Sequence, residues 1–540
     1  MRFPRNTWLF LLALPAFLAI HPNSAPAATF CVNEQADDGT GSAADCSDGA
    51  CSGSAGTCSL RDAIKAADLN DDADTITFSA SLSSPLTIIA GDSFGLPTIF
   101  SPVSIVGPGA EALTISIDGG SNTIFWFDAE EQPRSYSVSG LTLTQTGNTG
   151  FFADKIIQHR GTLTVSDTVI TGRGRGISGF AEELTINNST ISGNVTAPGD
   201  DVVGAGLNFG GGVDNGILTI NNSTFSNNQK LNTAGDADEG GGGIGIFDGS
   251  SLFDGTDFTV TLTNVTISGN QTNENGGGIW ISDDCAECSQ SAVIHATLTN
   301  VTLADNDADL NGNGGEGGGI FVSLSNPGAS VTLNNTLIAN NASGAGAADC
   351  SVSGISLASN GFNLVTDDTD CTGLSGSDIT GQDPLLAALA LNAPGSTETH
   401  ALDANSPAIN AGDNADCPDT DQRGVARPQG DACDIGAYEA VICGDGTVGP
   451  GEECEPSQEC CTDECLFADA GTSCDDGDPD TIDDQCTGDG AVCEGIPEDL
   501  EGDGGCSLNP GSTRANAAST LLLLTALAGL GFRLRRAKGR

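Results

Sequence analysis

The chain has 540 residues, which is too long for one compact core and long enough for two or three domains. Glycine supplies 74 residues and aromatic residues only 5%, so the composition favours an elongated array with a thin core. All 72 acidic residues lie between residues 29 and 513, and the same stretch contains only ten of the 18 basic residues. This negative charge repels phosphate and argues against nucleic-acid binding.

The first 28 residues have the composition of a secretory signal peptide. Arg2 and Arg5 precede the apolar run Trp8–Ile20, and residues 25–27 (Ala-Pro-Ala) supply small side chains for cleavage. The alternative, a retained transmembrane helix, is less favoured because the apolar run is short. We therefore expect an exported protein, in which disulfides are the ordinary state of most of the 19 cysteines.

Residues 29–96 lead into a helix and a strand. The apolar residues Leu60, Ile64 and Ala67 would share one face of a helix, and the sequence predicts a strand over Thr75–Phe78. The residues Cys-Ser-Leu-Arg-Asp-Ala that start at position 58 resemble the CSLREA region of exported bacterial β-helix proteins, with Asp in place of the usual Glu. This resemblance implies an N-terminal cap, because an amphipathic helix can close the open end of a β-helix.

Five segments then align without gaps and define a repeat. In each of them apolar residues alternate with Thr, Ser or Asn, which is the two-residue period of a strand. The segments are Leu184–Asn194, Leu218–Asn228, Val260–Asn270, Ala296–Asn306 and Val331–Asn341, with Leu163–Arg173 as a weaker sixth. Two apolar columns are expected to point inward, namely Ile186, Ile220, Leu262, Leu298 and Leu333, and Ile191, Phe225, Ile267, Leu303 and Ile338.

Two asparagine columns accompany the apolar ones. They comprise Asn188, Asn222, Asn264, Asn300 and Asn335, and Asn194, Asn228, Asn270, Asn306 and Asn341. Parallel strands stacked ~4.8 Å apart would let these amides hydrogen-bond along the stack, and the glycine runs between the segments permit tight corners. The pattern resembles right-handed parallel β-helix repeats, as in pectate-lyase-like and bacterial surface proteins, and assigns residues 97–400 to such a solenoid.

Residues 401–440 carry three further motifs. Ser406–Asp413, Asp421–Gly424 and Cys433–Glu439 resemble the C-terminal end of the same exported family, so we expect the β-helix to end here. Residues 441–497 resemble disintegrin-like modules, and their eight cysteines imply a small scaffold with up to four disulfides. The expected fold is therefore all-β, a right-handed parallel β-helix followed by a disulfide-rich module and a C-terminal helix.

Local spacing predicts further disulfides. The candidate pairs are Cys285 with Cys288, Cys350 with Cys371, and Cys417 with Cys433. A redox or half-zinc interpretation of Cys285 and Cys288 is weaker, since no second CxxC pair or suitably spaced His accompanies them.

Calcium is the only cofactor that the sequence leaves open. Asp476, Asp478, Asp480 and Asp484 stand at positions one, three, five and nine of a calcium loop. Position six is Thr481 and position twelve is Thr487, where such loops have Gly and Glu, so a solvated acidic loop is the favoured interpretation.

The last segments resemble bacterial sorting signals. Residues 498–514 form an acidic, glycine-rich linker, and residues 515–540 contain an apolar stretch with a basic tail, which predicts a transmembrane helix. The order resembles signals of the MYXO-CTERM or GlyGly-CTERM type, which implies processing by export and sorting machinery. Cys506 has no local partner and is the expected anchoring residue through a lipid. The alternative is a plain transmembrane anchor with Cys506 as a bystander.

The sequence favours a non-catalytic protein of the bacterial cell surface that binds glycans or proteins. The enzymatic alternative is a polysaccharide lyase, in which an Arg or Lys removes a proton beside a carboxylate. Arg160, Arg173 and Arg175 are the candidates for that role, because they belong to an unusually dense group of basic residues in this acidic chain. A glycoside hydrolase has less support, since the available acidic pairs lie in loops without accompanying His and Lys motifs.

Overall fold

The computed structural model divides the chain into two compact units, Met1–Glu455 and Pro456–Arg540. Each unit is described by itself. The structure describes residues 27–35, 42–43, 46, 57–89, 95–118, 123–129, 133–146, 155–179, 182–196, 203–210, 215–231, 240–247, 257–283, 292–310, 312, 314–344, 346 and 348–441, and parts of 454–497.

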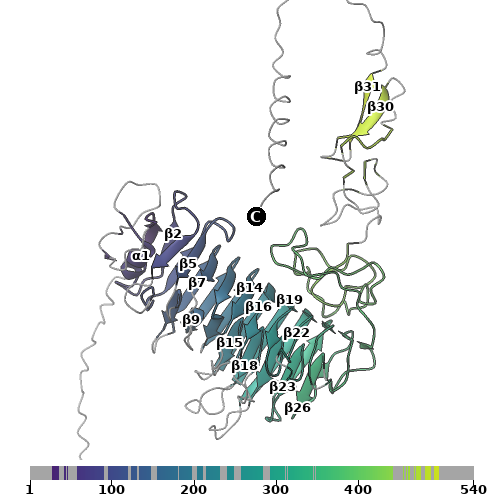
Figure 1. Ribbon diagram of the computed structural model, residues 1–540, viewed down its shortest axis with the longest axis horizontal. Helices are drawn as coiled ribbons and strands as arrows, with labels where there is room; N and C mark the ends of the chain where they lie inside the picture. Colours follow the sequence, from purple (N-terminus) through teal and green to yellow (C-terminus); the bar gives the residue numbers. More distant parts are fainter. Residues whose placement is uncertain are drawn as a thin grey trace, which may run out of the picture. The chain divides into compact units, whose positions relative to one another are not determined.

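The first unit is a stack of parallel strands arranged in three faces (Figure 1). Each strand pairs in parallel with the strand that lies one coil later in the sequence, for example β10 with β13 and β12 with β15. The chain visits the first, second and third face in turn before it climbs to the next coil. This connectivity is that of a parallel β-helix, and its right-handed sense stays a prediction that general crossover preferences support.

The first face contains one strand from every coil. Its members are β1 (Thr29–Val32), β2 (Asp74–Phe78), β4 (Val103–Val106), β7 (Ser135–Ser139), β10 (Thr162–Ser166), β13 (Glu183–Asn187), the first halves of β16 (Asn215–Ser226), β19 (Asp257–Ser268) and β22 (Val293–Ala304), β24 (Ser330–Asn334) and β27 (Ala358–Ser359). Strand stacking thus starts at residue 29, before the repeats, because β2 pairs with both β1 and β4.

The second face continues from the first around a corner. It contains β3 (Leu86–Ile89), β5 (Thr114–Asp118), β8 (Thr142–Gln145), β11 (Val169–Arg173), β14 (Thr190–Val195), the second halves of β16, β19 and β22, the short β17 (Gln229–Lys230) and β20 (Gln271–Thr272), β25 (Leu337–Ala339), β28 (Leu364–Val365) and β29 (Ile379–Thr380).

The third face closes each coil as a separate eight-stranded sheet. It contains β6 (Phe125–Asp128), β9 (Lys155–Arg160), β12 (Arg175–Gly179), β15 (Leu207–Gly210), β18 (Ile244–Phe247), β21 (Ile279–Ser282), β23 (Ile320–Ser323) and β26 (Cys350–Ser353). A glycine run precedes several of these strands, and there adjacent coils approach closely. A Cβ on Gly243 would lie only 2.7 Å from the carbonyl oxygen of Gly278 in the next coil, so a larger residue does not fit.

The two predicted apolar columns are confirmed. Residues of the first column, from Ile186 to Leu333, pair in register across β13, β16, β19, β22 and β24, and each is at most 1% exposed. The second column, from Ile191 to Ile338, is likewise in register and fully buried. Repetition of the strand period therefore produces one continuous core along the stack.

The two asparagine columns serve different purposes. From Asn194 to Asn341, each side-chain amide donates to the Oδ1 of the next asparagine at 2.8–2.9 Å, which confirms the predicted ladder. The ladder ends on the carboxylate of Asp349, 2.8 Å from Asn341 Nδ2. From Asn188 to Asn335, each asparagine adopts a positive φ between 46° and 53°, which forms the corner from the first to the second face.

The N-terminal helix packs against the same core. α1 (Leu60–Ala67) lies beside β2 in Figure 1, and Leu60, Ile64 and Ala67 are each 1% exposed, as their shared face predicts. Ser59 caps the helix, and the Asp62 carboxylate accepts a hydrogen bond from the Ser59 backbone N–H at 3.0 Å. The Asp that departs from the CSLREA pattern therefore completes a capping box.

The second unit contains a small antiparallel pair, β30 (Thr481–Cys486) and β31 (Cys493–Pro497). Two disulfides, Cys460–Cys486 and Cys474–Cys493, hold this pair to the residues before it. Among the residues that the structure describes, no helix is both long and apolar enough to cross a membrane. The predicted segment 515–540 lies outside the described residues, as do Cys506, Cys285 and Cys288.

Candidate functional site

The three candidate lyase arginines occupy different positions in one coil and its neighbour. Arg160 ends β9 with its side chain 54% exposed, 3.7 Å from Asp128. Arg175 begins β12 and is buried, in register with Lys155 at the opposite end of β9. Arg160 therefore lies five residues along β9 from the position that is level with Arg175, a separation of about 16 Å along the strand. Arg173 is exposed on the second face. The strands therefore do not bring the three residues to one point.

A buried histidine lies close by in the sequence but inside the core. His159 is fully buried, in register with Phe127 on one side and Gly179 on the other. A Cβ on Gly179 would collide with the imidazole, so this glycine makes room for the ring. Among the described residues, no group makes a well-formed hydrogen bond to either ring nitrogen. Burial lowers the pKa of His159 to about 3, an effect that the Gly161 backbone opposes only in part. His159 is therefore neutral at ordinary pH and cannot contact a substrate outside the stack.

The C-terminal segment 382–440 lies along the second face, shown in green beside β19 and β22 in Figure 1. Gln422 donates from its amide to Thr224 Oγ1 at 2.9 Å and accepts from Thr266 Oγ1 at 2.7 Å. The corner residue Asn300 donates to the Asp434 carbonyl oxygen at 3.0 Å, and Ser268 Oγ lies 2.8 Å from His400 Nε2. Segment 382–440 thus covers the outward residues of the second face between the coils of Asn222 and Asn335.

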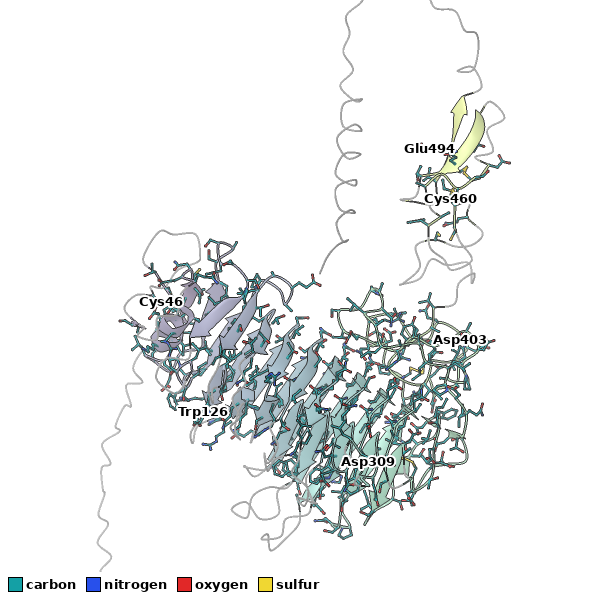
Figure 2. The ribbon with its side chains drawn as sticks, in the orientation of Figure 1. Cys46, Trp126, Asp309, Asp403, Cys460 and Glu494 are labelled. Atoms are coloured by element: carbon teal, nitrogen blue, oxygen red, sulfur yellow. A yellow bond between two sulfur atoms is a disulfide. The ribbon has the colours of Figure 1, made fainter. Side chains whose placement is uncertain are left out.

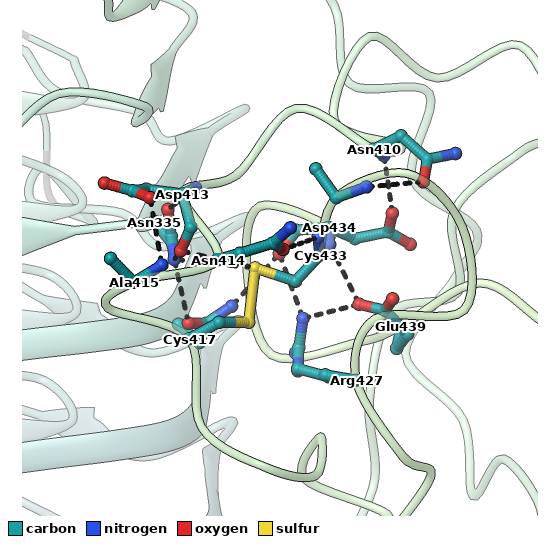
Figure 3. The surroundings of a disulfide bond; sticks show 12 residues. Asn335, Asn410, Asp413, Asn414, Ala415, Cys417, Arg427, Cys433, Asp434 and Glu439 are labelled. Carbon is teal, nitrogen blue, oxygen red and sulfur yellow. Dashed lines mark hydrogen bonds and ion pairs between the residues drawn. A yellow bond between two sulfur atoms is a disulfide. The ribbon is translucent and has the colours of Figure 1, made fainter.

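A buried group of charges holds that segment together (Figure 3). Arg427 donates to Glu439 Oε2 at 2.8 Å and to the Asp434 carbonyl oxygen at 2.9 Å, and its side chain is completely buried. Asp421 pairs with Arg423 at 2.7 Å, and the Arg423 guanidinium stacks 3.6 Å from the centre of the Tyr438 ring. Three acids therefore share two bases in this cluster.

Burial changes the protonation of the cluster. The pKa of Asp434 is raised to about 7, first by burial and then by the charge of Glu439. Burial also raises the pKa of Glu439, against the attraction of Arg427, and lowers the pKa of Arg427. Two of the three C-terminal motifs, Asp421–Gly424 and Cys433–Glu439, supply the acids and Arg423, and the motif Ser406–Asp413 adds the Asn410 N–H that donates to Asp434.

Three disulfides lie within the described part of the first unit, near its two ends. Cys46 is joined to Cys58 beside the helix. Cys350 is joined to Cys371 in the last coils, and Cys417 to Cys433 in segment 382–440, the two pairings expected from their spacing. In Figure 3 the Cys417–Cys433 bond lies next to Asn335, whose Nδ2 donates to the Asp413 carbonyl oxygen at 3.1 Å. This disulfide therefore fixes the segment where it meets the corner column.

The outer row of the third face mixes aromatic and polar side chains. Trp126, labelled in Figure 2, is 36% exposed, whereas Trp280 in the same row is 5% exposed. Between them, Ser178 and Asn208 are in register and fully buried, and their side-chain atoms make no hydrogen bond to the described part of the chain. Sequence reasoning missed this face. The sequence feature that could have revealed this face is a pair of apolar residues, separated by one residue, that follows several of the glycine runs, as in Gly-Gly-Gly-Ile-Gly-Ile at 241–246.

The first face carries an unbroken row of hydroxyl groups, which we call the hydroxyl column. Its members are in register on adjacent strands and each is half-buried, as expected for a flat sheet surface. They are Thr75, Ser104, Ser137, Thr164, Thr185, Thr219, Thr261, Thr297 and Thr332. None of these hydroxyls hydrogen-bonds to another group in the described part of the chain. Segment 382–440 bonds to the second face and its corner and leaves this column open.

The calcium candidates are only partly within the described residues. Asp484 lies in β30, and its carbonyl oxygen accepts from the Cys474 N–H at 3.1 Å, whereas Asp476, Asp478 and Asp480 fall outside. The sulfurs of Cys460, Cys474 and Cys486 lie within 4.8 Å of one another. Because Cys460 pairs with Cys486 and Cys474 with Cys493, disulfides account for this proximity, and an oxidised sulfur is not a thiolate ligand.

Comparisons with known proteins find little. The chain matches no protein-family model and no curated protein. Among solved structures, it is similar to the crystal structure of pectate lyase Pel9A, with 16% sequence identity and a TM-score of 0.37. The similarity covers 77% of this chain and 96% of that chain. The β-helix described above rests on the strand pairings of this molecule.

Proposed function

We propose that the chain is a non-catalytic protein of the bacterial cell surface that binds glycans or proteins through its β-helix. The observation that carries the proposal is the dispersal of the candidate catalytic bases. Arg160 is exposed and close to Asp128, Arg173 is exposed on another face, and Arg175 is buried. Proton abstraction beside a carboxylate needs a base within hydrogen-bonding reach of a positioned substrate, and this arrangement gives a lyase less support.

The remaining features of the stack are those of a rigid support. Its core is continuous, its buried amides are paired along the ladder, and segment 382–440 is tied down by buried charges. A rigid surface loses little conformational entropy when it binds, which favours recognition by many weak contacts. The proposal assigns no role to calcium.

The proposal is tested by a glycan array run with the exported protein, in parallel with an assay for unsaturated sugar products. We expect binding to one or more glycans, or to a protein, and no ultraviolet absorbance from new double bonds. Product formation that is lost in an Arg160→Gln variant but kept in Arg134→Gln would overturn the proposal in favour of a lyase. Arg134 is the matched control because it also pairs with an acid, Asp71, at 2.9 Å.

Anchoring is a separate part of the proposal. Cys506 would carry the lipid that keeps the chain at the envelope, after an enzyme of the sorting machinery removes the helix. A single acyl chain binds a membrane reversibly, so two would be needed for firm attachment. The test is Cys506→Ala in the native host, with the mature C-terminus determined by mass spectrometry. An unchanged C-terminus and unchanged membrane attachment would rule out Cys506 and favour a plain transmembrane anchor.

A further inference from the structure

We infer that the hydroxyl column and its two neighbouring columns form the binding surface, and that its occupant is the ordered surface of an uncharged polysaccharide. This inference rests on the proposed function and names the site and the class of ligand. The observations that carry it are the register of these columns, their hydrogen-bonding capacity and their lack of charge.

The first observation is periodicity. Two further columns flank the hydroxyl column, at the positions two residues before and after it in the seven first-face strands from β7 to β24. They are Ser135, Thr162, Glu183, Ile217, Thr259, His295 and Ser330, and Ser139, Ser166, Asn187, Asn221, Thr263, Thr299 and Asn334. Strand spacing repeats these groups every ~4.8 Å along the stack and every ~6.6 Å along each strand. The nine residues of the hydroxyl column therefore extend about 38 Å.

The second observation is hydrogen-bonding capacity. Each Ser or Thr hydroxyl can donate one hydrogen bond and accept others, and no described group of the protein uses those of the hydroxyl column. In the column that runs from Ser139 to Asn334, Asn221 Nδ2 donates to Asn187 Oδ1 at 3.0 Å and Asn334 Nδ2 donates to Thr299 Oγ1 at 3.2 Å. This bonding fixes their orientation. The surface thus presents fixed and repeated polar groups.

The third observation is charge. The chain carries 72 acidic residues, yet the three columns contain only one carboxylate, Glu183, and one imidazole, His295. The acidic chain as a whole repels anionic polymers such as polygalacturonate. An uncharged polymer experiences no such repulsion, and its hydroxyls match those of the face.

The occupant is expected to be ordered and extended rather than a short oligosaccharide. No aromatic side chain lies in the three columns, so no stacking contact binds a single sugar tightly. Hydroxyl contacts are individually weak, with net contributions of about 1 kcal/mol or less. They add up only when many form together, and a polymer that is already ordered loses little entropy on binding.

The experiment measures co-sedimentation of the full exported chain with microcrystalline cellulose and with chitin. Soluble cello-oligosaccharides and polygalacturonate serve as comparison ligands. We expect binding to at least one solid, little binding to the soluble ligands, and little change between 0.1 and 1 M salt because no ion pairs are involved (about a threefold change in screening length).

The decisive variant places two carboxylates in the centre of the face, Thr219→Glu with Thr261→Glu. Its matched control is Thr144→Glu with Thr171→Glu, since Thr144 and Thr171 are also neighbours in register but lie on the second face. We expect at least about a tenfold weaker binding for the first variant, equal to about 1.4 kcal/mol, and no change for the control. If the first variant folds poorly, Thr219→Val with Thr261→Val keeps the branched side chains and is expected to bind several-fold more weakly.

The outcomes separate this inference from the proposed function. Equal binding by both glutamate variants, with wild-type binding retained, overturns the inference and leaves the proposed function standing. A glycan array that finds only charged or short ligands also overturns it. Sedimentation that changes from dimer to monomer only in the Thr219/Thr261 variant would make a second copy of the chain the occupant. A chain that binds no glycan or protein at all contradicts both.

Discussion

Two parts of the first unit are held together in opposite ways. The coils between residues 155 and 345 repeat the same kinds of contact from layer to layer, such as the Asn228–Asn270–Asn306 ladder with 2.9 Å between successive amides. Segment 382–440 uses contacts that each occur once, such as the Arg427–Glu439 pair and the Gln422 bonds. Repetition makes the coils tolerant of local change, because each layer supports the next. The segment depends on individual residues.

The two parts also differ in the charges that they bury. The ladder of the coils consists of neutral amides, and the buried imidazole of His159 has a pKa lowered to about 3. The segment buries three acids with two bases, and burial raises the pKa of Asp434 to about 7. The coil that contains His159 and segment 382–440 are therefore expected to respond to pH in opposite directions.

The largest effect is expected from a charge in the core of the coils. Ile267 is fully buried, in register with Phe225 and Leu303. Ile267→Asp places a carboxylate without a partner among apolar side chains, which costs several kcal/mol and should unfold the array. Circular dichroism and thermal melting measure this loss.

The matched control for Ile267 is Thr261→Asp, which puts the same charge on the outer surface of the same strand. Surface substitutions of this kind change stability by about 0.5 kcal/mol or less. Equal melting of wild type and Ile267→Asp would contradict the assignment of this column to the core.

The next effect is acid sensitivity of the coils. His159 is neutral in the folded chain and takes up a proton in the unfolded chain below about pH 6.5. Its contribution to stability is therefore present above pH 6.5 and is lost as the pH falls towards 3. The shift corresponds to at most about 5 kcal/mol at the acid end.

His159→Leu should remove this part of the pH dependence. Hydrogen exchange of β9 and β12, measured from pH 7 to pH 4, provides the readout. The expected result, after correction for the intrinsic pH dependence of amide exchange, is lower protection at pH 4 than at pH 7 in wild type and a smaller decrease in the variant. The same acid response in both would show that His159 is not its source.

His159 also marks what the sequence does not reveal. Alternating apolar residues in 184–341 predict the first two faces, because their period and spacing are visible in the letters. The third face has short strands, and its coils vary in length, so its columns come into register only in the fold. A histidine among Lys-Ile-Ile-Gln-His-Arg looks like a surface residue of a basic stretch.

The C-terminal segment shows the same limit for the site. The motifs at 406–413, 421–424 and 433–439 are visible as a resemblance, but their role depends on contacts with residues far away in the sequence. Asn300, for example, reaches the carbonyl oxygens of Asp434 and Gly436. Strand alternation could predict that hydroxyls of the first face point outward. It could not predict that segment 382–440 would cover the second face and leave the first open.

A third prediction concerns the opposite pH response of the segment. Asp434 holds a proton up to about pH 7 when folded but ionises near 4 when unfolded, so the folded state binds more protons between these values. The contribution is present below about pH 4 and is lost as the pH rises through 7, by roughly 4 kcal/mol in total. Burial is the largest cause of this raised pKa; among the charged neighbours, Glu439 raises the pKa of Asp434 and Arg427 lowers it.

Asp434→Asn should flatten the pH dependence of the segment. Hydrogen exchange of residues 382–440 between pH 5 and pH 8, corrected for the intrinsic exchange rate, measures the slope, and the coils, whose own pH dependence this substitution should leave unchanged, are the internal reference. The slope is the useful quantity, because the new amide also disturbs the hydrogen bonds from Asn410 and Ala440. An unchanged slope would mean that another group titrates.

The smallest of these effects comes from the two disulfides, one in each part. Cys350–Cys371 closes 21 residues at the end of the coils, and Cys417–Cys433 closes 16 residues within the segment. Loop closure of this size contributes about 3 kcal/mol in each case. Ala in place of both cysteines of a pair should therefore destabilise locally, with the loss confined to residues 350–380 in one variant and to 382–440 in the other. Mass spectrometry of the non-reduced protein first checks that no free thiol is present at these four positions.

Hydrogen exchange then locates the effect. If Cys417→Ala with Cys433→Ala also loosens the coils, the segment stabilises the face that it covers, and the two parts fold as one. If the effect stays within 382–440, the repeated contacts of the coils are sufficient by themselves, which is the difference between the two parts that we expect.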